Sequence, residues 1–286
     1  MPTIPLQPDA GDPWRLLPFS DAPMGRQLAL SEGMLAALDQ TGAPALRWYV
    51  PRETALVLGN GQNPGVADGE TLAADHIALY RRPSGGTAVL VDAALLSLDI
   101  ALPHSHPLAT GDVVRAYEWV GALWAEALRG LGATKARALP VAETRAQPTL
   151  AKDDPLRLAC YGALSPWEVV VGEQAPRKLV GLCQTRRRYG ALYQIGVYLR
   201  FDAAALTRLL APSSAADQAA LAGRLAAAAI GLDEAADAQP DAPAVIAAVE
   251  GALTRRHGAA LIRSNWLPAE LDYAARIEGE RFQPLV

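Results

Sequence analysis

The chain is poor in cysteine and histidine. It has two cysteines, Cys160 and Cys183, among 286 residues. Two thiols cannot build the disulfide framework of a small secreted domain, and they lack the clustering of a structural zinc site. There are four histidines, and the closest pair, His104 and His106, offers only two ligands in a proline-bounded loop. We therefore expect no metal site.

The chain also lacks positive net charge and long apolar runs. Its formal net charge of −4 gives no indication of a basic surface that would bind nucleic acid. The one basic cluster, Arg186 to Arg188, indicates either a solvated loop or a contact surface for an acidic partner. No apolar run reaches the roughly 18 residues that span a bilayer, so no membrane association is expected. Residues 1–20 are proline-rich and unlike a signal peptide, which favours a loose N-terminal arm and a cytoplasmic protein.

The remaining composition is that of a folded α+β protein. Hydrophobic residues make up 51% and charged residues 20%, enough apolar mass for one large domain over residues 21–286. The spacing of apolar residues predicts helices over 26–39 and 112–131. Residues 133–158 are predicted to form a mobile or extended loop. From about residue 203 the chain becomes alanine-rich and helical. Short apolar runs predict the strands of a mixed sheet, over 45–50, 54–58, 77–81, 87–91, 95–102, 167–171, 178–183 and 193–201.

The segment from Arg81 to Asp92, RRPSGGTAVLVD, carries the first chemical signal. Gly85 and Gly86 have no side chains, so a ligand can approach their backbone N–H groups closely. A pair of glycines is also typical of a plain hairpin turn. The strand AVLV after them suits either an ordinary core or the wall of an acyl pocket.

The second signal is a thiol and an amine in one later stretch. Cys160 is either a small buried hydrophobe or a nucleophile whose thiolate a nearby cation stabilises. Lys178 is either a solvated edge residue or a cation that polarises a carbonyl group. Cys183 lies within a predicted strand and is interpreted as structural.

These segments together resemble the lipoate–protein ligase and octanoyltransferase family, which shares its fold with biotin–protein ligases. The family reads RR-x-SGG-x-AV after a G-x-x-Q-N turn, as here from Arg81 to Val89 and from Gly59 to Asn63. A lysine followed by G-x-x-Q and arginines forms the second block, here beginning at Lys178. The resemblance covers roughly residues 20–210 and implies a largely antiparallel sheet flanked by helices. It also implies a set of acyl- or carbonyl-binding residues: Arg82, Ser84, Gly85, Gly86, Thr87, Ala88, Gly181 and Gln184.

Within the family, the chain is most similar to the cysteine-dependent octanoyltransferases. Cys160 precedes Ser165, Trp167 and Glu168 in their C-x-x-x-x-S-x-[WY]-[ED] pattern. The resemblance is closest to the amidotransferase branch. It implies octanoyl or lipoyl transfer from the glycine-cleavage H protein to lipoyl domains of 2-oxoacid dehydrogenases, without a cofactor. Cys160 would carry the acyl thioester, and Lys178 would stabilise the oxyanion.

Three alternatives stay open at this point. A sister transferase would take octanoyl from acyl carrier protein through the same cysteine. An ATP-dependent lipoate ligase would need ATP and Mg²⁺, but Thr87 replaces the third glycine of its motif, and Tyr193 and Gln194 replace its His-Gly pair. A non-catalytic scaffold would have no need of both Cys160 and Lys178.

Overall fold

The computed structural model describes residues 13–212 and 214–285 and contains two sheets. The large sheet has eight strands in the order β11-β1-β2-β6-β10-β9-β8-β7. Pairing is parallel at β11-β1 and β1-β2 and antiparallel at the other junctions. The small sheet has the order β4-β3-β5, with β4 parallel and β5 antiparallel to β3. The predicted mixed, largely antiparallel α+β fold is confirmed.

The eight predicted strands are present in the predicted order, with ends shifted by a few residues, and three strands, β1, β7 and β11, were not predicted. Central strands such as β6 are buried along their whole length because helices cover both faces of the sheet. The strands are β1 (Pro13–Leu16), β2 (Ala45–Tyr49), β3 (Ala55–Leu58), β4 (Ala78–Arg81), β5 (Val89–Val91), β6 (Leu95–Pro103), β7 (Ala136–Ala138), β8 (Val169–Val171), β9 (Arg177–Arg187), β10 (Gly190–Tyr198) and β11 (Ala260–Arg263).

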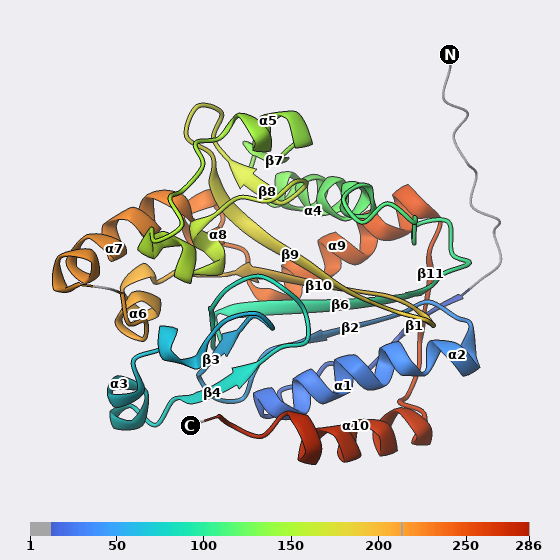
Figure 1. Cartoon of the computed structure of the whole chain (residues 1–286). Coiled ribbons are helices and arrows are strands. Elements are labelled where there is room, and N and C mark those ends of the chain that lie inside the picture. Colours follow the sequence, from blue (N-terminus) through green and yellow to red (C-terminus); the bar gives the residue numbers. More distant parts are fainter. Residues whose placement is uncertain (1–12, 213, 286) are drawn as a thin grey trace.

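The helices form layers on the two faces of the large sheet (Figure 1). Helix α1 packs against α10 on one face, and α4 packs against α9 on the other. Helices α6 and α7 pack against each other. The helices are α1 (Met24–Ala36), α2 (Leu38–Thr41), α3 (Gly69–Ala74), α4 (Glu118–Gly130), α5 (Val141–Ala146), α6 (Ala203–Arg208), α7 (Ala215–Ala228), α8 (Leu232–Ala235), α9 (Ala242–His257) and α10 (Pro268–Arg281).

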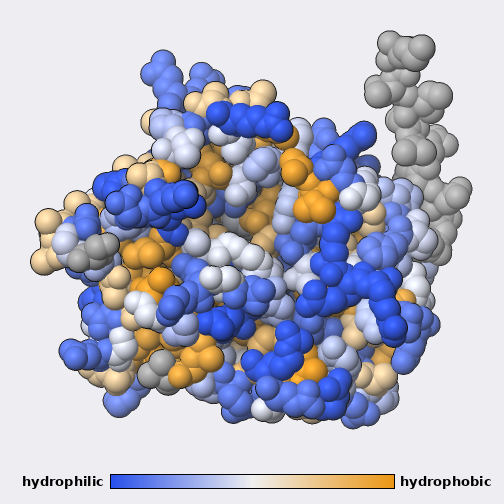
Figure 2. Space-filling view, viewed as in Figure 1, coloured by the Kyte–Doolittle hydropathy of each residue, from blue (hydrophilic) through white to orange (hydrophobic). Residues whose placement is uncertain are grey.

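Two main hydrophobic clusters lie between these layers. One joins the large sheet to α4 and α9, and the other joins the small sheet to α1, α6, α7 and α10. On the face in Figure 2, hydrophobic residues reach the surface in separate patches among hydrophilic ones. Among the described residues, no helix combines the length and apolar character needed to span a membrane.

Three predictions about the chain's organisation are corrected. Residues 13–20 are not a loose arm, because β1 pairs with both β2 and β11 and the indole of Trp14 is buried; residues 1–12 lie outside the described residues. The segment 133–158 is not a loop throughout, since it contains β7 and α5. The helix predicted over 112–131 begins only at Glu118 as an α-helix, because Asp112 caps an earlier turn through the amides of Val114 and Arg115.

Candidate active site

The thiol and the amine that the sequence singled out lie at one cavity. The cavity has a volume of about 520 Å³, and both Cys160 and Lys178 line it. Cys160 begins a short 3-10 turn, Cys160–Gly162, and its backbone N–H donates to the carbonyl of Ala88 at 2.9 Å. That hydrogen bond attaches the cysteine to the strand that follows the glycine pair. The two sequence blocks therefore meet through backbone contacts.

Lys178 is buried and makes its contacts inside the site. Its Nζ donates to the carbonyl oxygen of Cys160 at 2.8 Å and to Oε1 of Glu168 at 2.9 Å. The lysine is 1% exposed and Glu168 2% exposed. The Lys178 ammonium group therefore has three oxygen neighbours, the Cys160 carbonyl and the two carboxyl oxygens of Glu168. The interpretation of Lys178 as a solvated edge residue is excluded.

Glu168 is the site residue that the sequence reading used only as part of a motif. Its Oε2 lies 2.8 Å from Lys178 Nζ and accepts from the backbone N–H of Ser165 at 2.7 Å. Burial raises the pKa of the Glu168 carboxyl, and the neighbouring Lys178 opposes that shift. The Cys160 backbone, the Lys178 amine and the Glu168 carboxyl group thus meet at one side of the cavity.

The glycine turn offers unused backbone donors at the edge of the cavity. Within the described part of the chain, no hydrogen bond takes up the N–H of Gly85 or Gly86. Gly86 has φ +91°, and its carbonyl oxygen approaches Gly59 so closely that a Cβ on Gly59 would lie 1.9 Å from it. Both positions need glycine for this approach. Free N–H groups beside a nucleophile can stabilise an oxyanion.

Arg82 supports this turn from behind. Its guanidinium donates to the carbonyl of Gly85 at 3.0 and 3.2 Å and to that of Thr87 at 2.9 Å. The residue is 7% exposed. Arg82 reaches the cavity wall, but these donors are used on the protein's own backbone. We therefore assign it the role of shaping the turn.

The remaining predicted residues divide into lining and supporting positions. All members of the predicted set except Ser84 and Ala88 line the cavity. Ser84 is buried beside it, with Oγ 3.4 Å from Cys183 Sγ and 3.2 Å from Gln194 Oε1. Gln184 lines the cavity mouth and donates from Nε2 to the carbonyl of Val113 at 2.7 Å.

Apolar side chains form much of the cavity wall. The predicted strand AVLV contributes to it through Val89 and Val91, as expected of an acyl pocket wall. Cys183 also lines the cavity, and burial raises the pKa of its thiol, which keeps that thiol protonated. Other apolar contributors include Met24, Leu28, Val57, Leu95, Leu182 and Ile195.

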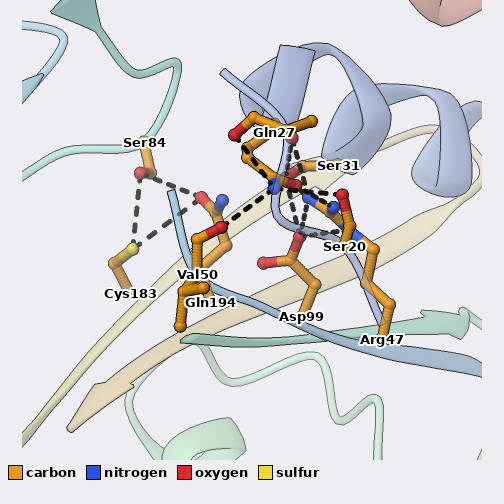
Figure 3. A network of polar contacts seen from close by, with 10 residues as sticks. Ser20, Gln27, Ser31, Arg47, Val50, Ser84, Asp99, Cys183 and Gln194 are labelled. Carbon is orange, nitrogen blue, oxygen red and sulfur yellow. Dashed lines mark hydrogen bonds and ion pairs between the residues drawn. The ribbon is translucent and has the colours of Figure 1, made fainter. Parts of the chain in front are cut away.

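A buried polar network lies under this wall, against helix α1. Arg47 and Asp99 form an ion pair with Nη2 2.8 Å from Oδ2, and both are fully buried. Ser31 donates to the same oxygen of Asp99 at 2.7 Å. Figure 3 shows this network beside the group of Ser84, Cys183 and Gln194. Because Gln194 pairs with Asp99 in register across β10 and β6, the network and the cavity share the same strands.

The model of the lipoyl protein ligase A/B catalytic domain matches residues 23–254. The chain belongs to this family. Relatives in the family include an octanoyltransferase LipM of Kyrpidia tusciae, 32% identical over 199 residues, which are 69% of this chain and 70% of that protein. A second octanoyltransferase LipM, from Macrococcus caseolyticus, is 29% identical over 175 residues, which are 60% of each chain.

Solved structures confirm the fold of this family. The bipartite lipoate protein ligase of Thermoplasma acidophilum, studied with its E2 lipoyl domain, superposes with a TM-score of 0.77 at 16% identity, covering 95% of this chain and 94% of that one. A lipoate-protein ligase A bound with ATP gives 0.72 at 16% identity, covering 95% and 96%. At such identities the likeness supports the fold alone.

Proposed function

We propose that the protein transfers an octanoyl group to the target lysine of lipoyl domains through an acyl thioester on Cys160. The observation that carries this proposal is that Cys160 and the buried Lys178 line one largely apolar cavity, with the ammonium bound to the Cys160 carbonyl. The family membership and the octanoyltransferase relatives support it. Each buried CH₂ of the acyl chain contributes about 0.8 kcal/mol to binding in such a cavity.

The reaction has two halves that use the same groups. The Cys160 thiolate attacks the donor carbonyl, and the N–H groups of Gly85 and Gly86, together with Lys178, stabilise the oxyanion. The donor's leaving group departs and the acyl chain remains on Cys160. The acceptor amine then attacks the thioester and releases the thiol. Neither half needs a nucleotide, so we propose that no cofactor is required, with ATP and Mg²⁺ belonging to the ligase alternative.

Two donors fit this chemistry. The octanoylated glycine-cleavage H protein would present an amide, and octanoyl-acyl carrier protein a thioester. The H protein remains our predicted donor, and the second is the alternative. A catalytic free thiol works best in a reducing compartment, so the cytoplasm is the proposed location.

Arg186 to Arg188, at the end of β9, are a proposed contact surface for an acidic carrier domain. Arg186 is used internally, because its Nη2 donates to the carbonyl of Thr110 at 2.8 Å. Arg187 and Arg188 are exposed. Replacing these two by glutamate should slow transfer to a lipoyl domain and reduce its dependence on salt. Unchanged transfer kinetics would remove this surface from the proposal.

Intact mass after mixing with each octanoylated donor, without ATP, tests the function. We expect the gain of one octanoyl group, its loss in Cys160→Ser, and its retention in Cys183→Ser, the matched control for a thiol in the same cavity. An adduct from octanoyl-acyl carrier protein alone would select the alternative donor. No adduct from either, with acylation of a lipoyl domain only when ATP and free acid are supplied, would establish the ligase reaction.

A further inference from the structure

Glu168 is a buried carboxyl group for which the proposed reaction names no task. It lies 2.8 and 2.9 Å from the ammonium of Lys178 through its two oxygens. The same ammonium reaches the carbonyl of Cys160 at 2.8 Å. Lys178 therefore stands between the carboxyl group and the residue that carries the thiol. Such a chain can pass protons when the Cys160 thiol turns toward the ammonium, with Glu168 at its far end.

The backbone places this carboxyl group by an uncommon conformation. Trp167 has φ +70°, a left-handed value that non-glycine residues seldom adopt. Its N–H donates to the carbonyl of Leu139 at 2.7 Å, and the N–H of Leu139 donates to the carbonyl of Glu168 at 2.9 Å. A Cβ on Gly121 would lie 2.1 Å from the carbonyl oxygen of Trp167. Strain that the surroundings maintain in this way is characteristic of functional positions.

A strand irregularity turns Lys178 toward the same point. Val169 pairs with Val180 whereas Val170 pairs with Lys178, so β9 bulges against β8 between these residues. Bulges next to active sites redirect side chains. Two independent backbone features therefore bring the carboxyl and the amine together.

The net charge of the site indicates what the Lys178–Glu168 pair does. Ammonium and carboxylate together are neutral, and a thiolate at Cys160 would add one uncompensated negative charge to a buried site. Other ionisable groups whose charges would interact with Glu168 are the phenols of Tyr117 and Tyr161, and burial raises the pKa of both, so they stay neutral. Moving the thiol proton onto Glu168 keeps the total charge of the site unchanged.

We propose that Glu168 is the proton reservoir of this site, exchanging protons with the reacting groups through Lys178. The inference rests on the proposed function. In the first half, the S–H bond of Cys160 breaks and its proton reaches Glu168 as Lys178 passes one of its own protons on. The proton returns through Lys178 to the departing amine or thiol as the new C–S bond replaces the bond to that group.

In the second half, the acceptor amine forms the C–N bond and loses one proton. That proton passes through Lys178 to Glu168 and returns to the Cys160 sulfur when the C–S bond breaks. Every proton is accounted for without an external acid or base. Because Glu168 acts through Lys178, it is a positioning and proton-storing residue rather than one that touches substrate.

The test separates the two halves with small reactants. Octanoyl-N-acetylcysteamine acylates Cys160 without a carrier protein, and Nα-acetyl-lysine amide serves as the acceptor amine. Glu168→Gln keeps an oxygen that accepts from Lys178 but cannot take up a proton. Glu173→Gln, at an exposed glutamate before β9, is the matched control. Mass spectrometry follows both halves, and iodoacetamide reports the reactivity of the thiol.

We expect Glu168→Gln to slow aminolysis of the acyl-enzyme about 100-fold, within the range of general base catalysis. Acylation uses the same relay and should slow as well. Alkylation of Cys160 returns no proton and should stay near the wild-type rate, because the unpaired Lys178 cation still favours the thiolate. Equal losses in all three reactions would reduce Glu168 to a support for Lys178, and no loss would remove its role. Either result overturns the inference. Failure of Cys160 to become acylated at all would instead reject the proposed function.

The wild-type pH profile supplies a second measurement that needs no variant. Below the raised pKa of Glu168, aminolysis requires ionisation of both the carboxyl and the acceptor amine, so log rate should rise with a slope of about two. Above that pKa the slope should fall to about one. Glu168→Gln should show a slope of about one throughout. Identical slopes for the wild type and Glu168→Gln over the whole pH range in which the protein is folded would overturn the inference.

Discussion

Replacing Lys178 by methionine should destabilise the protein in a strongly pH-dependent way. The substitution leaves the buried Glu168 without the cation that lies 2.8 Å from its Oε2. An ionised carboxylate left unpaired in the interior costs about 3–5 kcal/mol. The group can escape this cost by taking a proton, and the fully buried surroundings already raise its pKa in the native protein. Loss of Lys178 removes the opposing influence and raises that pKa further.

The direction of the pH dependence follows from proton binding. Between the ordinary carboxyl pKa and the raised one, the folded variant binds a proton that the unfolded chain has released. Its stability therefore falls as pH rises, by about 1.4 kcal/mol per unit while both conditions hold. From pH 5 to pH 8 the additional loss relative to wild type reaches at most about 4 kcal/mol. Most of the damage should thus be absent at pH 5.

Urea unfolding at pH 5, 6.5 and 8 measures this effect. The matched control is the double variant Lys178→Met with Glu168→Gln, which has no buried charge at this point. Replacing a buried ion pair by neutral groups is often nearly neutral for stability, so the double variant should recover most of the loss at pH 8. The reasoning is refuted if the single variant loses as much at pH 5 as at pH 8, or if the double variant recovers nothing.

Three further substitutions test the turn and the network beneath it. Gly59→Ala places a methyl group against the carbonyl of Gly86, so we expect a loss of about 1–3 kcal/mol in thermal unfolding and slower acylation of Cys160. Arg82→Lys cannot reproduce the guanidinium contacts to the turn, so it should lower the stability of the fold by about 1.5–3 kcal/mol and slow acylation. An unchanged acylation rate would show that the turn keeps its shape without Arg82. Asp99→Asn leaves Arg47 buried without its counter-ion, and chemical unfolding should show a loss of about 3–5 kcal/mol.

Much of the fold could be predicted from the sequence because its central strands are long apolar runs. The strand β6 is buried throughout and was recognisable from LLSLDIAL alone. The sequence does not predict β11, because its apolar run ALI is only three residues long and follows directly on helix α9. β1 is equally short and begins with a proline, so it resembled part of the arm. Short strands such as these are defined by the strands beside them rather than by their own residues.

The site residues that belong to a sequence motif could be predicted, and the contacts that depend on local backbone conformation could not. Cys160, Lys178 and the glycine pair were found from local sequence, and they line one cavity. The pairing of Glu168 with Lys178 depends on a bulge and on a left-handed tryptophan, and neither has a sequence signal of its own. The hydrogen bonds of Arg82 to the backbone of the turn could not be predicted either, because an arginine near a glycine turn can bind a ligand as well as backbone carbonyl groups.

The position of β1 bears on how the chain folds during synthesis. Pro13 pairs with Ala260, and helix α1 packs against α10, so the first elements to be made have partners among the last. Until those partners emerge, β1 lacks its outer neighbour and α1 keeps an apolar face uncovered. Such long-range pairings slow folding and expose unfinished edges to aggregation. The sheet and helix layers are complete only after β11 and α10 have been synthesised, and until then β1 and α1 stay exposed.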